Sequence, residues 1–104
     1  MTADQGSEPA IRATFLGPGG RPVKLTARTW RHITLRHPEV APMLDHVRRA
    51  IEHPTDALPG REAGEQWLYL RVSSAPAPWL KVVVRYEAQG GGWVATAFLR
   101  RSKP

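Results

Sequence analysis

The sequence predicts an α+β domain in which two helices, preceded by a small hairpin, pack on a three- to four-stranded antiparallel sheet. Between residues 27 and 52, apolar residues recur at the three- and four-residue spacing of a helix face. After about residue 65 they alternate with polar residues, as in strands that bury one side. A chain of 104 residues fits one domain with one modest core. Helices followed by an antiparallel meander form a two-layer packing.

The first residues predict a tail and a hairpin. Residues 1–10 are polar and are expected to be a disordered tail. Residues 11–16 predict a short strand, and residues 17–20, Gly-Pro-Gly-Gly, predict a turn because glycine supplies positive φ and proline fixes φ. Residues 22–25 can return as a second strand.

Two helices are expected next. Thr26 is a good N-cap for a helix over about residues 27–37, and Pro38 ends or bends that helix. The second helix is expected over about residues 40–52, with Pro42 tolerated in its first turn. The apolar stripe of this second helix consists of Val40, Met43, Leu44, Val47 and Ile51.

The second half of the chain predicts the sheet. The expected strands cover residues 66–72, 79–87 and 93–99, after a short strand or loop at residues 56–60. A loop at residues 73–78 and a glycine-rich turn at residues 89–92 connect them. Residues 101–104 are expected to be a basic tail, which leaves residues 11–100 as the domain.

Alternation along the strands predicts which side chains face away from the helices. Leu68, Leu70 and Val72 should face the helices. In the last strand, either Val94, Thr96 and Phe98 face the core, or Trp93, Ala95, Ala97 and Leu99 do. In the second case the outer face carries Tyr69, Arg71, Lys81, Arg85, Thr96 and Arg100. Basic groups among aromatic rings suit nucleic acid, but they also fit the ordinary polar face of a half-solvated sheet.

Composition narrows the partners and the compartment. The net charge of +6 and the sequence pI of about 10.8 favour an anionic partner, RNA above others, although an arginine-rich solvated surface has the same charge. The chain has no cysteine, which excludes disulfides and thiolate zinc sites. No apolar run approaches the roughly 18 residues of a membrane span, and the N-terminus does not resemble a signal peptide. We therefore expect a cytoplasmic protein.

Two histidines are the candidate acid and base. His32 and His37 flank the basic segment 31–36. Metal-independent RNA cleavage needs a base, an acid and cations, and this segment offers all of them. Each histidine also has an ordinary interpretation, since His37 can cap the helix C-terminus and His32 can lie on the surface. The spacing of five residues places them on different helical faces, so no metal site and no cofactor is expected.

The order of several short segments resembles a known family. Trp-Arg-His-Ile at residues 30–33 with His-Pro-Glu at 37–39 resembles a "W-x-H-I … H-P-E" helix. Residues 47–54, 80–86 and 94–98 are similar to its "v-x-x-A-I-x-x-P", "l-k-V-V-V-r-y" and "v-x-T-A-F" segments. The family is the phage-type branch of the barnase–EndoU–colicin–RelE-like nuclease superfamily, and the resemblance covers about residues 26–100.

This resemblance implies N-terminal helices on an antiparallel sheet and a metal-independent endoribonuclease, often a toxin or phage effector with a cognate antitoxin or immunity protein. Its catalytic positions correspond here to His32, His37, Arg85 and Thr96. The expected RNA-binding residues are Arg36, Tyr69, Arg71, Lys81 and Arg100. The sheet offers no outward glutamate as a base like that of barnase. The alternative is a non-catalytic module of the same fold that binds nucleic acid or a protein.

Overall fold

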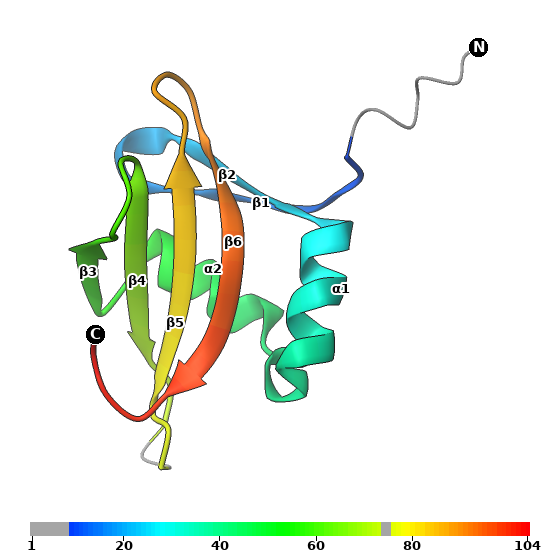
Figure 1. Ribbon diagram of the computed structural model, residues 1–104, viewed down its shortest axis with the longest axis vertical. Helices are drawn as coiled ribbons and strands as arrows, with labels where there is room; N and C mark the ends of the chain where they lie inside the picture. Colours follow the sequence, from blue (N-terminus) through cyan, green and yellow to red (C-terminus); the bar gives the residue numbers. More distant parts are fainter. Residues whose placement is uncertain (1–8, 74–75) are drawn as a thin grey trace.

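The sheet is larger than the sequence predicts. The computed structural model describes residues 9–73 and 76–104, so most of the expected N-terminal tail and part of the loop at 73–78 lie outside the described residues. It confirms the α+β class, with two helices packed on a sheet (Figure 1). The sheet is mixed and six-stranded, in the order β1-β2-β6-β5-β4-β3, where three or four antiparallel strands were expected. The strands are β1 Ile11–Leu16, β2 Pro22–Thr26, β3 Asp56–Pro59, β4 Glu65–Arg71, β5 Trp79–Tyr86 and β6 Gly92–Arg100.

The N-terminal hairpin joins the sheet instead of standing apart. Strand β2 runs parallel to β6 and pairs with it at Val23–Gly92 and Lys24–Trp93, whereas all other pairings are antiparallel. The pairing buries Phe15, Val23 and Leu25 in the core. A two-stranded hairpin alone is marginally stable in water. Burial of these three side chains stabilises its packing against the rest of the sheet.

The helices begin and end at recognisable signals. Helix α1 spans Ala27–Arg36, and the Thr26 hydroxyl accepts a hydrogen bond from the Thr29 amide at 3.0 Å. A 3₁₀ turn at Pro38–Val40 follows, and α2 covers only Leu44–Glu52. The second helix therefore starts four residues later than the predicted 40. Prolines at 38 and 42 supply no amide hydrogen to a helix ladder there, so the chain turns first.

The two helices take different positions on the sheet. Helix α2 lies behind the sheet in Figure 1 and contacts β4 and β5, while α1 lies beside β6. One side of the sheet is therefore free of helices, and we call it the open face. By strand register, its side chains include Trp67, Tyr69, Lys81, Val83, Thr96, Phe98 and Arg100.

A bulge in β6 decides which of its residues reach the open face. Val83 pairs with Thr96 and Val84 with Val94, so Ala95 is an extra residue. Val94 before the bulge and Ala97 after it are both buried in the core. The orientation with Val94 facing the core is therefore correct before the bulge, and the orientation with Ala97 facing the core is correct after it. The bulge places Thr96, Phe98 and Arg100 together on the open face.

The centre of the open face is buried, contrary to the expectation of a half-solvated surface. Tyr69 is 0% exposed and Lys81 is 6% exposed. The Lys81 ammonium lies 3.6 Å from the centre of the Trp67 ring, and the Tyr69 and Phe98 rings lie further out. The chain end returns toward β3 (Figure 1), where the Lys103 ammonium is 2.8 Å from the Asp56 carboxylate. Within the described ranges, no helix is long and apolar enough to cross a membrane.

Candidate functional site

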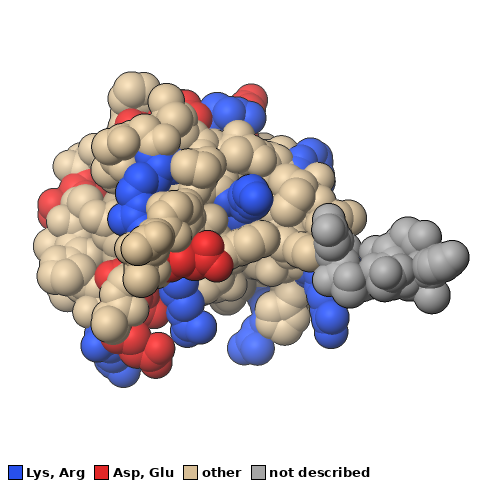
Figure 2. Space-filling model, turned by 90° about the horizontal axis from the view of Figure 1, so that it is seen from above, with Lys and Arg blue, Asp and Glu red and all other residues tan. Residues whose placement is uncertain are grey.

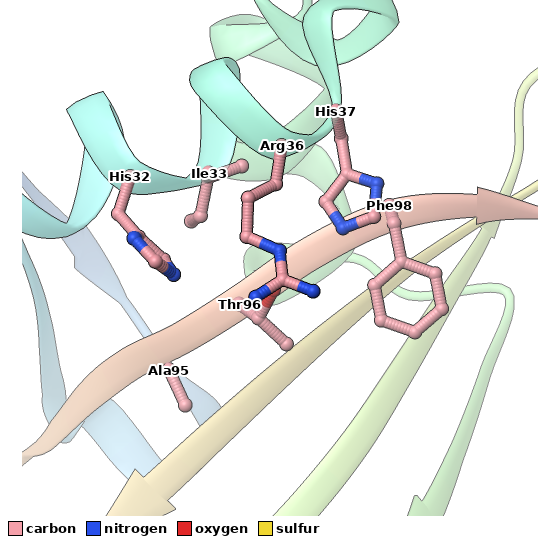
Figure 3. A pocket seen from close by; sticks show the side chains of 7 residues that line it. All are labelled: His32, Ile33, Arg36, His37, Ala95, Thr96 and Phe98. Atoms are coloured by element: carbon pink, nitrogen blue, oxygen red, sulfur yellow. The ribbon is translucent and has the colours of Figure 1, made fainter.

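Four of the predicted site residues meet in a pocket between α1 and β6. The pocket has a volume of about 430 Å³ and contains residues from both elements (Figure 3). Its lining residues are His32, Ile33, Arg36, His37, Ala95, Thr96 and Phe98. The helix and the strand are about 60 residues apart in sequence, so this grouping depends on the tertiary fold.

Local structure explains how these side chains reach the pocket. Ile33 is buried and fixes one face of α1 against the core. His32 and Arg36 are four residues apart and therefore share the next face of the helix. Strand β2 pairs with β6 only at Gly92 and Trp93. Beyond Trp93, helix α1 lies along this edge of β6 in place of a strand. The pocket forms along that stretch.

His37 is held from two sides. Its ring stacks on Phe98, with centroids 5.4 Å apart and an interplanar angle of 29°. Its Nδ1 lies 3.8 Å from the Glu39 carboxylate. This separation exceeds hydrogen-bond distance, so the carboxylate acts on the ring only through its charge. Figure 3 shows one His37 ring nitrogen directed toward the side of the pocket where Arg36 and Thr96 lie.

His32 and Arg36 have more freedom than His37. Both are exposed. No ion pair or side-chain hydrogen bond ties either of them to another residue in the part of the chain that the structure describes. Figure 3 shows the Arg36 guanidinium between the two histidine rings and beside Thr96. A guanidinium in that position can donate hydrogen bonds to an anion bound between the histidines.

Arg85 does not belong to this pocket, although it was expected to act with the histidines. Its Nε lies 3.9 Å from the Glu65 carboxylate, and its side chain is 60% exposed. It is two residues from Val83, the partner of Thr96, so it lies further along the open face. Its charge is already partly neutralised by Glu65.

A second pocket of about 490 Å³ contains two other predicted residues, Lys81 and Arg100. Arg61, Glu62, Glu65, Trp67, Val83 and Pro104 complete its lining. Burial lowers the pKa of Lys81 from its ordinary value, and the nearby charges of Arg100 and Arg61 lower it further. A hydrogen bond from the Arg61 amide, 2.7 Å long, holds the pKa of Glu65 below its ordinary value.

Tyr69 is buried, unlike the sequence expectation, whereas Arg71 is exposed as expected but lines neither pocket. Burial raises the pKa of the Tyr69 hydroxyl, which has no hydrogen-bond partner among the described residues. Tyr69 lies opposite Lys81 on the neighbouring strand, with its ring centre 5.6 Å from the ammonium. Arg71 is exposed, and its guanidinium lies 5.3 Å from the centre of the Trp79 ring, away from both pockets.

Four contributors were missed in the sequence: Phe98, Glu39, Arg61 and Glu65. The expectation that the sheet offers no outward glutamate is wrong, because Glu65, the first residue of β4, lines the second pocket. Phe98 was missed because the sequence does not reveal the bulge, which decides the face of the sheet on which this side chain lies. Glu39 lay within the His-Pro-Glu segment that carries the resemblance, but only the turn at Pro38–Val40 brings it near His37. Arg61 lies between β3 and β4, in a loop with no motif.

The surface charge is mixed. On the face seen in Figure 2, Lys and Arg side chains lie at several separate places, with Asp and Glu among them. Within residues 9–73 and 76–104, no group of three or more His, Asp or Glu side chains is placed to hold a metal ion.

The chain matches no protein-family model, no curated protein and no solved structure closely enough to indicate a relative. The resemblance to the nuclease superfamily therefore rests on the segments quoted above.

Proposed function

We propose that the protein is a metal-independent endoribonuclease whose active site is the pocket between α1 and β6. The observation that carries the proposal is the meeting of His32, His37, Arg36 and Thr96 in one cavity. Two groups that can exchange protons, a permanent cation and a hydroxyl are the set that this reaction needs.

In the proposed reaction, one histidine accepts the proton of a ribose 2′-hydroxyl, whose oxygen then attacks the adjacent phosphorus. The bond between phosphorus and the 5′-oxygen breaks, and the other histidine donates a proton to that oxygen. The products are a 2′,3′-cyclic phosphate end and a 5′-hydroxyl end. Arg36 stabilises the extra negative charge on the phosphorane, and Thr96 donates a hydrogen bond to a phosphate oxygen.

This assignment modifies the expected role of Arg85. Arg36 lies in the cavity, whereas Arg85 is paired with Glu65 outside it. Arg85 then contributes to the general attraction of RNA along the open face and not to the chemistry. The roles of toxin or phage effector, of tRNA or mRNA as substrate, and of an antitoxin or immunity partner are part of the proposal and rest on the sequence resemblance.

The test is cleavage of total RNA and a tRNA pool by purified protein in EDTA. General acid–base catalysis contributes about 10²- to 10⁴-fold, so His37→Ala and His32→Ala should each reduce the rate by about 100-fold or more. His53→Ala, at the exposed end of α2, is the matched control and should cleave as the wild type does. Cleaved ends should carry cyclic phosphate, and a 2′-O-methylated RNA should resist.

The competing function is a binding module without catalysis. The pairing of Arg85 with Glu65 favours it, because that pair removes an expected catalytic cation. Salt-dependent RNA binding without cleavage by the wild type would support the module and reject the nuclease.

A further inference from the structure

The second pocket is lined by three cations and by two carboxylates, Glu62 and Glu65, so its positive charge is only partly offset. Lys81, Arg61 and Arg100 line it together. No salt bridge involves Lys81 in the described residues, although its side chain is 6% exposed. A buried ammonium without a directly paired carboxylate is costly, and an anion bound beside it would offset part of that cost.

The acidic residues of this pocket do not compensate Lys81. The Glu65 carboxylate accepts hydrogen bonds from the Arg61 amide at 2.7 Å and the Glu62 amide at 3.4 Å. It also lies near Arg85. Glu65 is thus engaged by its own loop, and its attraction is the weakest of the effects on the pKa of Lys81.

Aromatic rings fix the position of the ammonium. Lys81 Nζ is 3.6 Å from the Trp67 ring centre and 5.9 Å from the Phe98 ring centre. These contacts keep the lysine extended toward the pocket without supplying a hydrogen-bond acceptor. Among the described residues no protein oxygen accepts a hydrogen bond from this ammonium, so it can donate to oxygen atoms of a ligand that enters the pocket.

We propose that this pocket binds a phosphate monoester, the group found on a free nucleotide or at a phosphorylated RNA end. A monoester carries up to two negative charges and three acceptor oxygens, which suits three converging cations. An internal phosphodiester has one charge and two ester arms, so it uses such a concave site less well. The pocket itself stands apart from the nuclease proposal, whereas its link to RNA ends rests on that proposal.

The position of the pocket gives this link a physical basis. Phe98 separates the two pockets, since its ring stacks on His37 and also faces Lys81. An RNA end held at Lys81 would run past Phe98 toward the histidines within a few nucleotides. The monoester site would then select where on the strand cleavage occurs, measured from a phosphorylated end.

Calorimetric titration with adenosine 5′-monophosphate tests the site, with adenosine and sodium sulfate as comparison ligands. We expect saturable binding of the monophosphate, weaker binding of sulfate and none of adenosine. Lys81→Met and Arg100→Gln should each weaken binding at least tenfold. Arg71→Gln, a cation of the open face outside the pocket, should bind within twofold of the wild type. Arg100→Gln keeps the test valid if Lys81→Met does not fold.

Absence of saturable monophosphate binding by the wild type, or equal binding by folded Lys81→Met and Arg100→Gln, would overturn the proposal. Binding of the monophosphate by a wild type that cleaves no RNA would leave this site standing and reject the nuclease. Cleavage assays with 5′-phosphorylated and 5′-hydroxyl oligonucleotides separate the two sources of the ligand. A preference for the phosphorylated strand, lost in Arg100→Gln, identifies the RNA end. Equal cleavage of both, with monophosphate binding intact, assigns the pocket to a free nucleotide.

Discussion

The ring of His37 stacks on the ring of Phe98, whose centre also lies 5.9 Å from the Lys81 ammonium. One aromatic side chain on β6 thus orients a candidate catalytic group on one side and a buried cation on the other. The bulge at Ala95 makes this possible, because it directs Phe98 to the open face.

Phe98→Leu should affect both pockets. The stack contributes on the order of 1 kcal/mol beyond burial, so the free energy of unfolding should fall by about that amount. The proposed cleavage should slow about tenfold through kcat, since His37 loses its support. Phe98→Tyr keeps the ring and should retain most of the activity. Chemical denaturation and steady-state kinetics measure the two effects. Unchanged kcat in Phe98→Leu would contradict the proposed position of His37.

Glu39→Gln should lower kcat and leave KM nearly unchanged. The amide keeps the shape of the side chain but removes the charge 3.8 Å from His37 Nδ1. The proposed role of Glu39 is to orient the ring, so a decrease of about 5- to 10-fold is expected, far less than in a buried triad. Glu87→Gln, an exposed residue that lines neither pocket, is the matched control for loss of a surface charge. Equal kinetics in the two variants would assign Glu39 no role.

Lys81→Met should change how stability depends on pH. The pKa of Lys81 is lowered in the folded state, so between that lowered value and the ordinary lysine pKa the unfolded chain binds more protons. This lysine therefore makes the wild type more stable as pH rises through that window. Below the lowered pKa both states are protonated, and the cost of burying the charge is fully present. Melting temperatures of both proteins should be measured from pH 7 to pH 10. The melting temperature of Lys81→Met should fall relative to that of the wild type as pH rises. A constant difference would contradict a desolvated ammonium.

Thr26→Ala should destabilise the protein by about 1 kcal/mol, because it removes the acceptor for the Thr29 amide at the start of α1. Thr29→Ala keeps that hydrogen bond, which uses only the backbone of residue 29, and should cost less. Urea denaturation of both variants gives the comparison. If the two variants lose equal stability, the cap is not the determinant of this helix start.

Short-range patterns predict most of the elements, and long-range pairing explains what they miss. The Thr26 cap, the glycine turns and the alternation in residues 79–86 act locally, so α1 and β5 lie close to where the sequence places them. The β2–β6 pairing joins residues about 70 apart and has no local signal. The second helix was predicted to start too early because the apolar stripe continues through a segment that prolines prevent from forming a helix.

In the candidate site, too, local patterns predict some of the residues and long-range structure decides the others. The grouping of His32, Arg36 and His37 follows from one helix and its end, and it is visible in the sequence. Whether Thr96 joins them depends on a one-residue bulge that alternation alone does not reveal. The burial of Tyr69 and Lys81 depends on neighbouring strands and on the C-terminal residues near β3. The alternation of polar and apolar residues does not show this, so the sequence predicted a more exposed face.

The parallel pairing of β2 with β6 also bears on the order of folding. During synthesis, residues 11–26 emerge first, but their partner strand begins only at residue 92. Phe15, Val23 and Leu25 consequently lack part of their final surroundings until β6 has left the ribosome. Contacts of such large sequence separation slow folding and prolong the exposure of unpaired strand edges. The β1–β2 hairpin then completes its packing late although it is synthesised before β6, and in this interval the chain is open to aggregation or to binding by a chaperone.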